Sequence, residues 1–103
     1  MAGTQIAQGV TYSLQPASGV TSFAVAGGGA GGRAAGTIII RASAANSSTA
    51  CGWGFGNASQ DLAAGEAVAI DVPPGYSVDL TTLYFDGRGN TGQIIFLSAV
   101  ILP

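Results

Sequence analysis

Short runs of β-branched and aromatic residues recur along the chain, and this pattern constrains the fold more than any other feature. The runs are separated by Gly, Pro, Asn and Asp at intervals of about ten residues, and helical periodicity is hard to find. In one run Val68 and Ile70 share a parity while Asp71 lies on the other. The pattern predicts roughly seven or eight strands in an all-β fold, an antiparallel two-sheet sandwich of jelly-roll or Greek-key type.

The length of 103 residues suits one domain, and we expect residues 1–103 to form a single β-sandwich. Residues 1–9 are expected to form an extended N-terminal arm. Residues 27–36, "GGGAGGRAAG", are expected to form a flexible glycine-rich loop. This loop lacks the lysine of a phosphate-binding loop. Arg33 in its middle is a candidate contact with a carboxylate of a neighbouring subunit.

The scarcity of charge predicts a protein that is covered by other protein. Charged residues make up 8% of the chain, against roughly 25% in a typical soluble domain. The surface must therefore consist largely of small and uncharged side chains, which favours self-association. We therefore expect a homo-oligomer. With three arginines, no lysine and a net charge of -2, nucleic-acid binding is not expected.

The residue inventory argues against an enzyme. The chain has no histidine and one cysteine, Cys51, which excludes Ser-His and Cys-His pairs, disulfides and CxxC zinc sites within one chain. Its five acidic residues do not cluster as a catalytic pair would. We therefore expect no catalytic residue, no cofactor and no metal. No apolar run approaches the ~18 residues of a membrane span, and the N-terminus lacks the pattern of a signal peptide.

The stretch "LYFDGRGNTGQIIF", Leu83 to Phe96, is predicted to be a β-hairpin. Its asparagine and glycines suit the positive φ angles of a tight connection, which we expect at positions 87, 89, 90 and 92. A calcium loop is disfavoured because Arg88 stands where a ligand belongs, leaving only Asp86 and Asn90 as side-chain ligands. Arg88 is instead a candidate contact with a neighbouring subunit.

The last strand, residues 94–102, is apolar on both parities. Such a strand is either covered on both sides within its domain or lies in a subunit contact. In so small a domain we favour the contact. The candidate contact residues on this strand are Ile95, Leu97 and Ile101.

Large apolar residues alternate with glycines in "ACGWGFGN". Trp53 and Phe55 share a face with Cys51, and packing in the core is the favoured interpretation of all three. The alternative is an aromatic platform for a sugar ring, formed by Trp53, Phe55 and Tyr84.

From about residue 38 onward the chain resembles a known module. The elements that carry the likeness are "LAAGEAVAIDVP" and "DLTTLYFDGRGNTGQIIFL", together with the strands that connect them. They are similar to the small β-sandwich module of tailed-phage virion proteins. The likeness covers about 60 of the 103 residues, and the family pattern carries no catalytic residue.

This resemblance implies a non-enzymatic virion component that is made in the host cytoplasm. The leading hypothesis is a capsid decoration (cement) protein on the capsid exterior, bound to the major capsid protein or to other virion proteins. With this role a trimer is the favoured homo-oligomer. The alternative is an adhesin module of a tail or head fibre that binds host surface glycans. Neither role involves a membrane.

Overall fold

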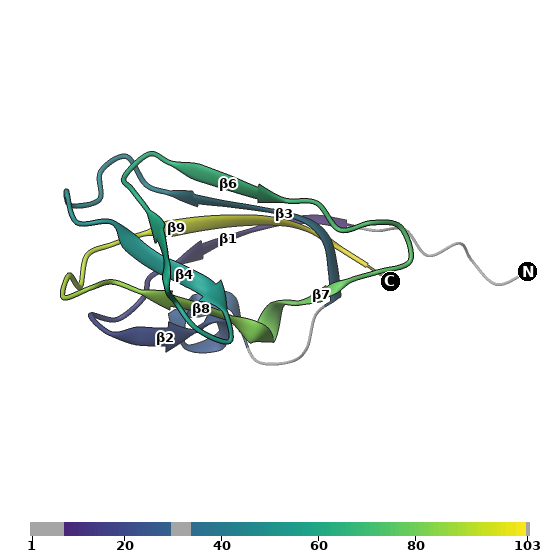
Figure 1. The fold of residues 1–103 in the computed structure, drawn as a ribbon, viewed down its shortest axis with the longest axis horizontal. Coiled ribbons are helices and arrows are strands. Elements are labelled where there is room, and N and C mark those ends of the chain that lie inside the picture. Colours follow the sequence, from purple (N-terminus) through teal and green to yellow (C-terminus); the bar gives the residue numbers. More distant parts are fainter. Residues whose placement is uncertain (1–7, 30–33, 103) are drawn as a thin grey trace, which may run out of the picture.

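Nine strands in two antiparallel sheets form a sandwich in the computed structural model (Figure 1). The structure describes residues 8–29 and 34–102. This confirms the predicted all-β, two-sheet fold, with more strands than expected. The strands are β1 (Gln8–Leu14), β2 (Val20–Ser22), β3 (Ala34–Ala42), β4 (Cys51–Phe55), β5 (Gln60–Leu62), β6 (Ala67–Ile70), β7 (Val78–Asp79), β8 (Leu83–Asp86) and β9 (Ile95–Ile101).

The strand order is that of a jelly roll. One sheet has the order β1-β9-β3-β6, with β7 also pairing with β3, and the other has the order β2-β8-β4-β5. The pairs are nested along the chain: β4 pairs with β5, β3 with β6 and β7, β2 with β8, and β1 with β9. Rolling up such a nested ribbon gives the two Greek keys of a jelly roll. Figure 1 shows the two sheets as separate layers.

Alternation along the strands places the core between the sheets. In β3, Ile38 and Ile40 are fully buried, whereas Ile39 is 44% exposed and Arg41 is also on the surface. Each strand thus contributes one parity to a single apolar cluster. Its largest members are Leu14, Phe23, Ile38, Ile40, Leu62, Leu80, Leu83, Phe85, Ile95 and Leu97.

The predicted hairpin between residues 83 and 96 is wrong. β8 pairs with β2 and β4, while β9 pairs with β1 and β3 in the other sheet. The segment between them, residues 87–94, therefore crosses from one sheet to the other. Within it, positive φ occurs at Arg88 (52°) and Gly89 (84°) and not at positions 87, 90 and 92. Asn90 N–H donates to the Gly87 carbonyl at 3.1 Å, which closes a tight turn around Arg88 and Gly89.

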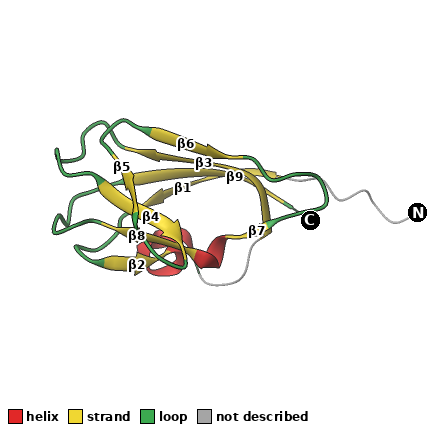
Figure 2. Cartoon of the chain, in the orientation of Figure 1, coloured by secondary structure: helices red, strands yellow, loops and turns green. Residues whose placement is uncertain are grey.

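Both ends of the predicted glycine-rich loop belong to other elements. Its first residues belong to a short helical turn, η1 (Ala24–Gly28), and residues 34–36 belong to β3. A second helical turn, η2 (Leu80–Thr82), precedes β8; both turns are red in Figure 2. Arg33 and residues 1–7 of the predicted arm lie outside the described residues, whereas residues 8 and 9 belong to β1.

The carboxylate of Asp79 caps η2, and this predicts a pH-dependent contribution to stability. Its Oδ1 accepts hydrogen bonds from Thr81 N (2.9 Å) and Thr81 Oγ1 (2.7 Å), which lower the pKa of Asp79 below its ordinary value of 3.8. A lowered native pKa gives stability that is present above the unfolded pKa and lost as the pH falls through the native pKa. Because Asn also caps helices but does not titrate here, Asp79→Asn should make the loss of stability below about pH 4 shallower.

Chemical denaturation at a series of acidic pH values measures this effect. Asp71→Asn is the matched control, because it removes an exposed carboxylate that makes no hydrogen bond within the described part of the chain. If both variants change the acid limb of the stability profile equally, the Asp79 cap does not exist in solution.

Candidate functional site

The three aromatic residues of the predicted glycan platform do not share a face. Trp53 and Phe55 pack edge to face at 6.2 Å between ring centroids, with Phe55 40% exposed and Trp53 packed partly against the core. Tyr84 pairs with Gly54, whereas Phe85 pairs with Trp53. Directly paired residues project to the same face of a sheet, so Tyr84 lies on the face opposite Trp53. The platform as predicted is therefore wrong, and Trp53 and Phe55 remain together without Tyr84.

The contact residues predicted on the last strand belong to the core side of β9. Ile95 and Leu97 are 0% exposed, and Ile101 packs partly buried against the same core. The opposite parity of β9 carries Phe96 and Val100, together with Ser98, and faces outward. The prediction that Ile95 and Leu97 make subunit contacts is wrong, because the core occupies their entire surface.

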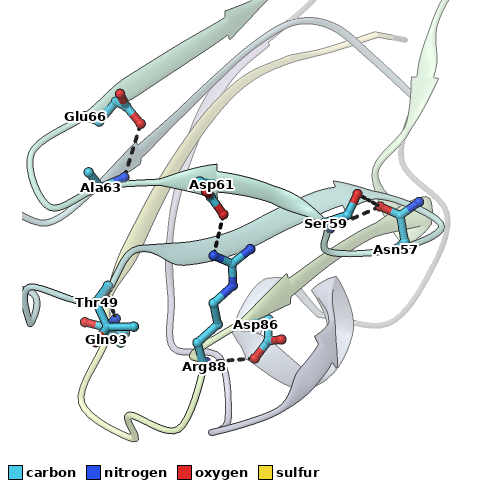
Figure 3. Close-up of polar contacts among 9 residues, drawn as sticks. All are labelled: Thr49, Asn57, Ser59, Asp61, Ala63, Glu66, Asp86, Arg88 and Gln93. Carbon is cyan, nitrogen blue, oxygen red and sulfur yellow. Dashed lines mark hydrogen bonds and ion pairs between the residues drawn. The ribbon is translucent and has the colours of Figure 1, made fainter.

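The glycines of β4 allow the chain to fold back over this strand. A Cβ on Gly52 would lie 2.3 Å from the Ala58 carbonyl oxygen, and one on Gly54 would lie 2.5 Å from the Asn57 carbonyl oxygen. Only glycine permits backbone to approach so closely. Asn57 Oδ1 accepts hydrogen bonds from Ser59 N (3.2 Å) and Ser59 Oγ (2.9 Å), which hold the returning segment in place (Figure 3).

Arg88 is the centre of the one ion pair among the described residues. Its guanidinium pairs with Asp61 of β5, and its backbone N–H donates to Asp86 Oδ1 at 2.7 Å (Figure 3). The side chain passes over Gly52, where a Cβ would lie 3.2 Å from Arg88 Nε. Arg88 is thereby drawn back onto the four-stranded sheet, with its side chain 29% exposed.

This arrangement occupies the groups that a calcium ion would need. Asp86 already accepts from Arg88 N, and Asn90 Nδ2 donates to the carbonyls of Gly87 (3.4 Å) and Arg88 (3.2 Å). A cationic guanidinium also lies between Asp61 and Asp86. No group of three or more acidic or cysteine side chains within residues 8–29 and 34–102 is placed to hold a metal.

The positive φ of Arg88 predicts that two substitutions at this position differ in their free energy of unfolding. Arg88→Ala should lower the free energy of unfolding by about 1 kcal/mol, because it removes the ion pair with the largely exposed Asp61. Arg88→Gly also removes the pair but relieves the positive φ, so it should be more stable than Arg88→Ala by about 1 kcal/mol. Urea denaturation of the two variants measures this. Equal stabilities would show that residue 88 does not keep a positive φ in solution.

Cys51 is buried in the core, as the sequence indicated. Burial raises the pKa of its thiol, and the nearby Arg88 opposes this rise only in part. A protonated thiol packed in an apolar core acts as a small hydrophobic side chain and not as a nucleophile.

Two polar side chains that the sequence did not single out hold the loops at one end of the sandwich. Gln93 is 1% exposed, and its Oε1 accepts from Ser47 N at 2.9 Å. Its Nε2 donates to the Thr49 carbonyl at 2.9 Å (Figure 3). Asn46 makes two hydrogen bonds with the backbone of Ile94. A polar hollow of about 470 Å³ lies beside them. Since both side chains are satisfied internally, we assign them a structural role.

The outward side of the sheet β1-β9-β3-β6 is the candidate functional surface; we call it the outer face. Its exposed apolar side chains include Ile39 (44%) and Val100 (39%), and its other positions are mostly Ser, Thr, Ala and Gly. An apolar hollow of about 190 Å³ lies on it, beside Gly9 and Val100. One guanidinium, that of Arg41, lies 5.2 Å from the centroid of the Phe96 ring. A face of mostly small and uncharged side chains suits contact with protein.

Comparison with known proteins gives no relative for this chain. No protein-family model matches it, and no curated protein and no solved structure matches it. No helix in the described part of the chain is long and apolar enough to span a membrane. The function is therefore argued from the residues themselves.

Proposed function

We propose that the chain is a non-enzymatic structural protein of a tailed-phage particle. In this proposal it is a decoration (cement) protein on the outside of the capsid, where it bridges major capsid subunits. The jelly-roll sandwich agrees with the module that the C-terminal half resembles. A likeness of fold alone does not define a function, so the proposal depends on the chemistry of the surface.

The observation that carries the proposal is how the few charges are used. Asp61 pairs with the Arg88 guanidinium, and Asp86 accepts a hydrogen bond from the Arg88 backbone N–H. Glu66 and Asp79 accept hydrogen bonds within their own turns. Among the described residues this leaves Arg41 and Asp71 as the charged side chains that contact neither an opposite charge nor a turn. A surface with so little free charge is suited to being covered by other protein.

Such a protein would stabilise a capsid through burial and needs no chemistry. Each buried Å² of apolar surface contributes about 25 cal/mol, and the contribution is repeated at every copy on the particle. The small side chains of the outer face also allow a capsid subunit to approach the sheet closely. In this proposal the chain has no catalytic residues, as we expect from the sequence.

Composition analysis of purified particles tests this proposal directly. Virions of the phage that encodes the chain should carry it in many copies, and recombinant protein should bind capsids stripped of it. Arg88→Ala should weaken this binding, while leaving the domain folded, if Arg88 contacts a capsid subunit. Absence of the chain from purified virions would rule the proposal out.

The second candidate is glycan binding, because the Trp53–Phe55 pair leaves Phe55 40% exposed. Aromatic rings with one exposed face can stack on a sugar ring. A glycan array probed with the isolated protein distinguishes the two functions. Binding that is lost in Phe55→Ala but kept in Tyr84→Ala would favour the adhesin, since Tyr84 lies on the other face.

A further inference from the structure

The outer face is organised in three rows that run across its strands. The first row contains Ser13, Phe96, Arg41 and Ala67, which are paired from strand to strand. The middle row contains Thr11, Ser98, Ile39 and Ala69 in the same way. The third row begins with the pair Gly9 and Val100 on β1 and β9. Successive rows are two residues apart along each strand, about 6.6 Å.

The charges of this face lie at its two ends. Arg41 is in the first row and forms no ion pair within the described residues. Asp71 is exposed, follows Ile70 directly and continues the parity of Ala67 and Ala69, which places it level with the third row. Four residues of strand, about 13 Å, separate the level of Arg41 from that of Asp71. The middle row lies halfway between the two charges.

The shape of the outer face also changes along its strands, in the same direction as its charge. The aromatic ring of Phe96 stands in the first row, beneath Arg41. The apolar hollow of about 190 Å³ extends from the middle row to the third row, and its lining includes Thr11, Ile39, Ser98, Gly9 and Val100. Phe96 and Val100 are both on β9, four residues apart. The Arg41–Phe96 pair and the hollow are therefore displaced from each other in the same direction as the cation and the anion.

We propose that the outer face binds a second copy of the chain through a two-fold axis along the middle row. This axis, parallel to the sheet and perpendicular to the strands, exchanges the first and third rows. Arg41 of each copy is then level with Asp71 of the other, one strand across, within reach of the long arginine side chain. The Arg41–Phe96 pair of each copy lies against the hollow of the other. Ile39, which is 44% exposed, packs on its own symmetry mate at the axis. Every contact occurs twice, as an isologous interface requires.

The dimensions of the face predict a weak dimer. Four strands spaced by ~4.8 Å and covered for about seven residues give a footprint of about 400 Å² per copy. A standard stable interface buries about 800 Å² on each partner. We therefore expect a dissociation constant of about 10–100 µM. This two-fold dimer is an alternative to the trimer expected of a decoration protein, and it goes beyond the proposed particle function, because it concerns the isolated chain.

Sedimentation velocity of the full chain and its variants tests the dimer. Arg41→Glu and Asp71→Arg each place like charges opposite one another at two symmetric positions, and each should weaken dimerisation by at least about tenfold. The double variant Arg41→Glu/Asp71→Arg restores opposite charges and should return the dissociation constant to within about threefold of the original. Ile39→Glu should abolish dimerisation, because two carboxylates meet at the axis.

Ser48→Glu is the matched control, because it adds one negative charge at an exposed loop position away from the outer face. The dissociation constant of Ser48→Glu should equal that of the unmodified chain. Circular dichroism shows whether every variant is folded. A chain that stays monomeric at ten times the expected dissociation constant would overturn the proposal. So would a trimer, a dimer indifferent to Ile39→Glu, or single-charge losses that the double variant does not restore.

Discussion

Gly87→Ala is expected to destabilise the protein by about 2–4 kcal/mol, a large fraction of the stability of a small domain. A Cβ at this position would lie 2.4 Å from the Ala17 carbonyl oxygen and 2.5 Å from the Asn90 carbonyl oxygen. Both are backbone atoms, so no flexible side chain can move aside. Gly87 N also donates to the Ala17 carbonyl at 3.1 Å, a bond that any shift would strain. Urea denaturation measures the effect.

Gly92→Ala in the same segment is the control. A Cβ there meets no atom within 4 Å, and the residue has no positive φ. Removing a glycine where alanine fits restricts the unfolded chain, so Gly92→Ala should be neutral or stabilising by up to about 1 kcal/mol. Similar losses in both variants would mean that the segment from 87 to 94 does not cross between the sheets as described.

Local alternation allowed the fold class to be predicted from the sequence. The pattern placed Val68 and Ile70 on one parity and Asp71 on the other, and the structure agrees, because Val68 and Ile70 pack against the core and Asp71 is exposed. Such predictions succeed because side chains in a strand alternate with a period of two, which depends only on neighbouring residues. Where a strand is polar on one parity and apolar on the other, the apolar parity is the buried one.

Strand partners could not be predicted in this way. β8 and β9 are adjacent in the sequence, and their glycine-rich connection suggested a hairpin, yet they lie in different sheets. A connection of this length permits either arrangement, and the choice depends on pairing between distant strands such as β1 with β9. The prediction of the glycan platform was wrong for the same reason. Trp53 and Tyr84 are on separate strands, and the register between those strands cannot be predicted from local sequence.

The turn at Arg88 shows a second limit. Glycines at 87 and 92 suggested positive φ, but the structure uses the first as a close-approach site and gives the positive φ to Arg88. The carboxylates of Asp86 and Asp61 hold the Arg88 backbone and guanidinium, which offsets the strain of that conformation. Residues 61 and 88 are far apart in the sequence, and they meet because β5 and β8, which Arg88 follows, belong to the same sheet.

Leu97→Ala is expected to destabilise the isolated chain by about 2–5 kcal/mol, whatever the protein concentration. Leu97 is 0% exposed in the middle of β9, the strand that lies between β1 and β3, so the truncation leaves a cavity between the two sheets. The sequence had assigned this residue to a subunit contact, which would instead predict weaker association and unchanged monomer stability. Both parities of β9 are apolar, and for that reason the pattern alone could not choose between them.

Val100→Ala on the same strand provides the control for the other face. Val100 is 39% exposed, so its truncation should change the stability of the monomer by less than about 1 kcal/mol. It should instead weaken dimerisation, because the side chain borders the hollow of the outer face, which the second copy covers. Denaturation at a concentration well below the dissociation constant separates monomer stability from association. If Val100→Ala unfolded the monomer and Leu97→Ala did not, the assignment of the two faces of β9 would be reversed, and the outer face would lose its place as the interface.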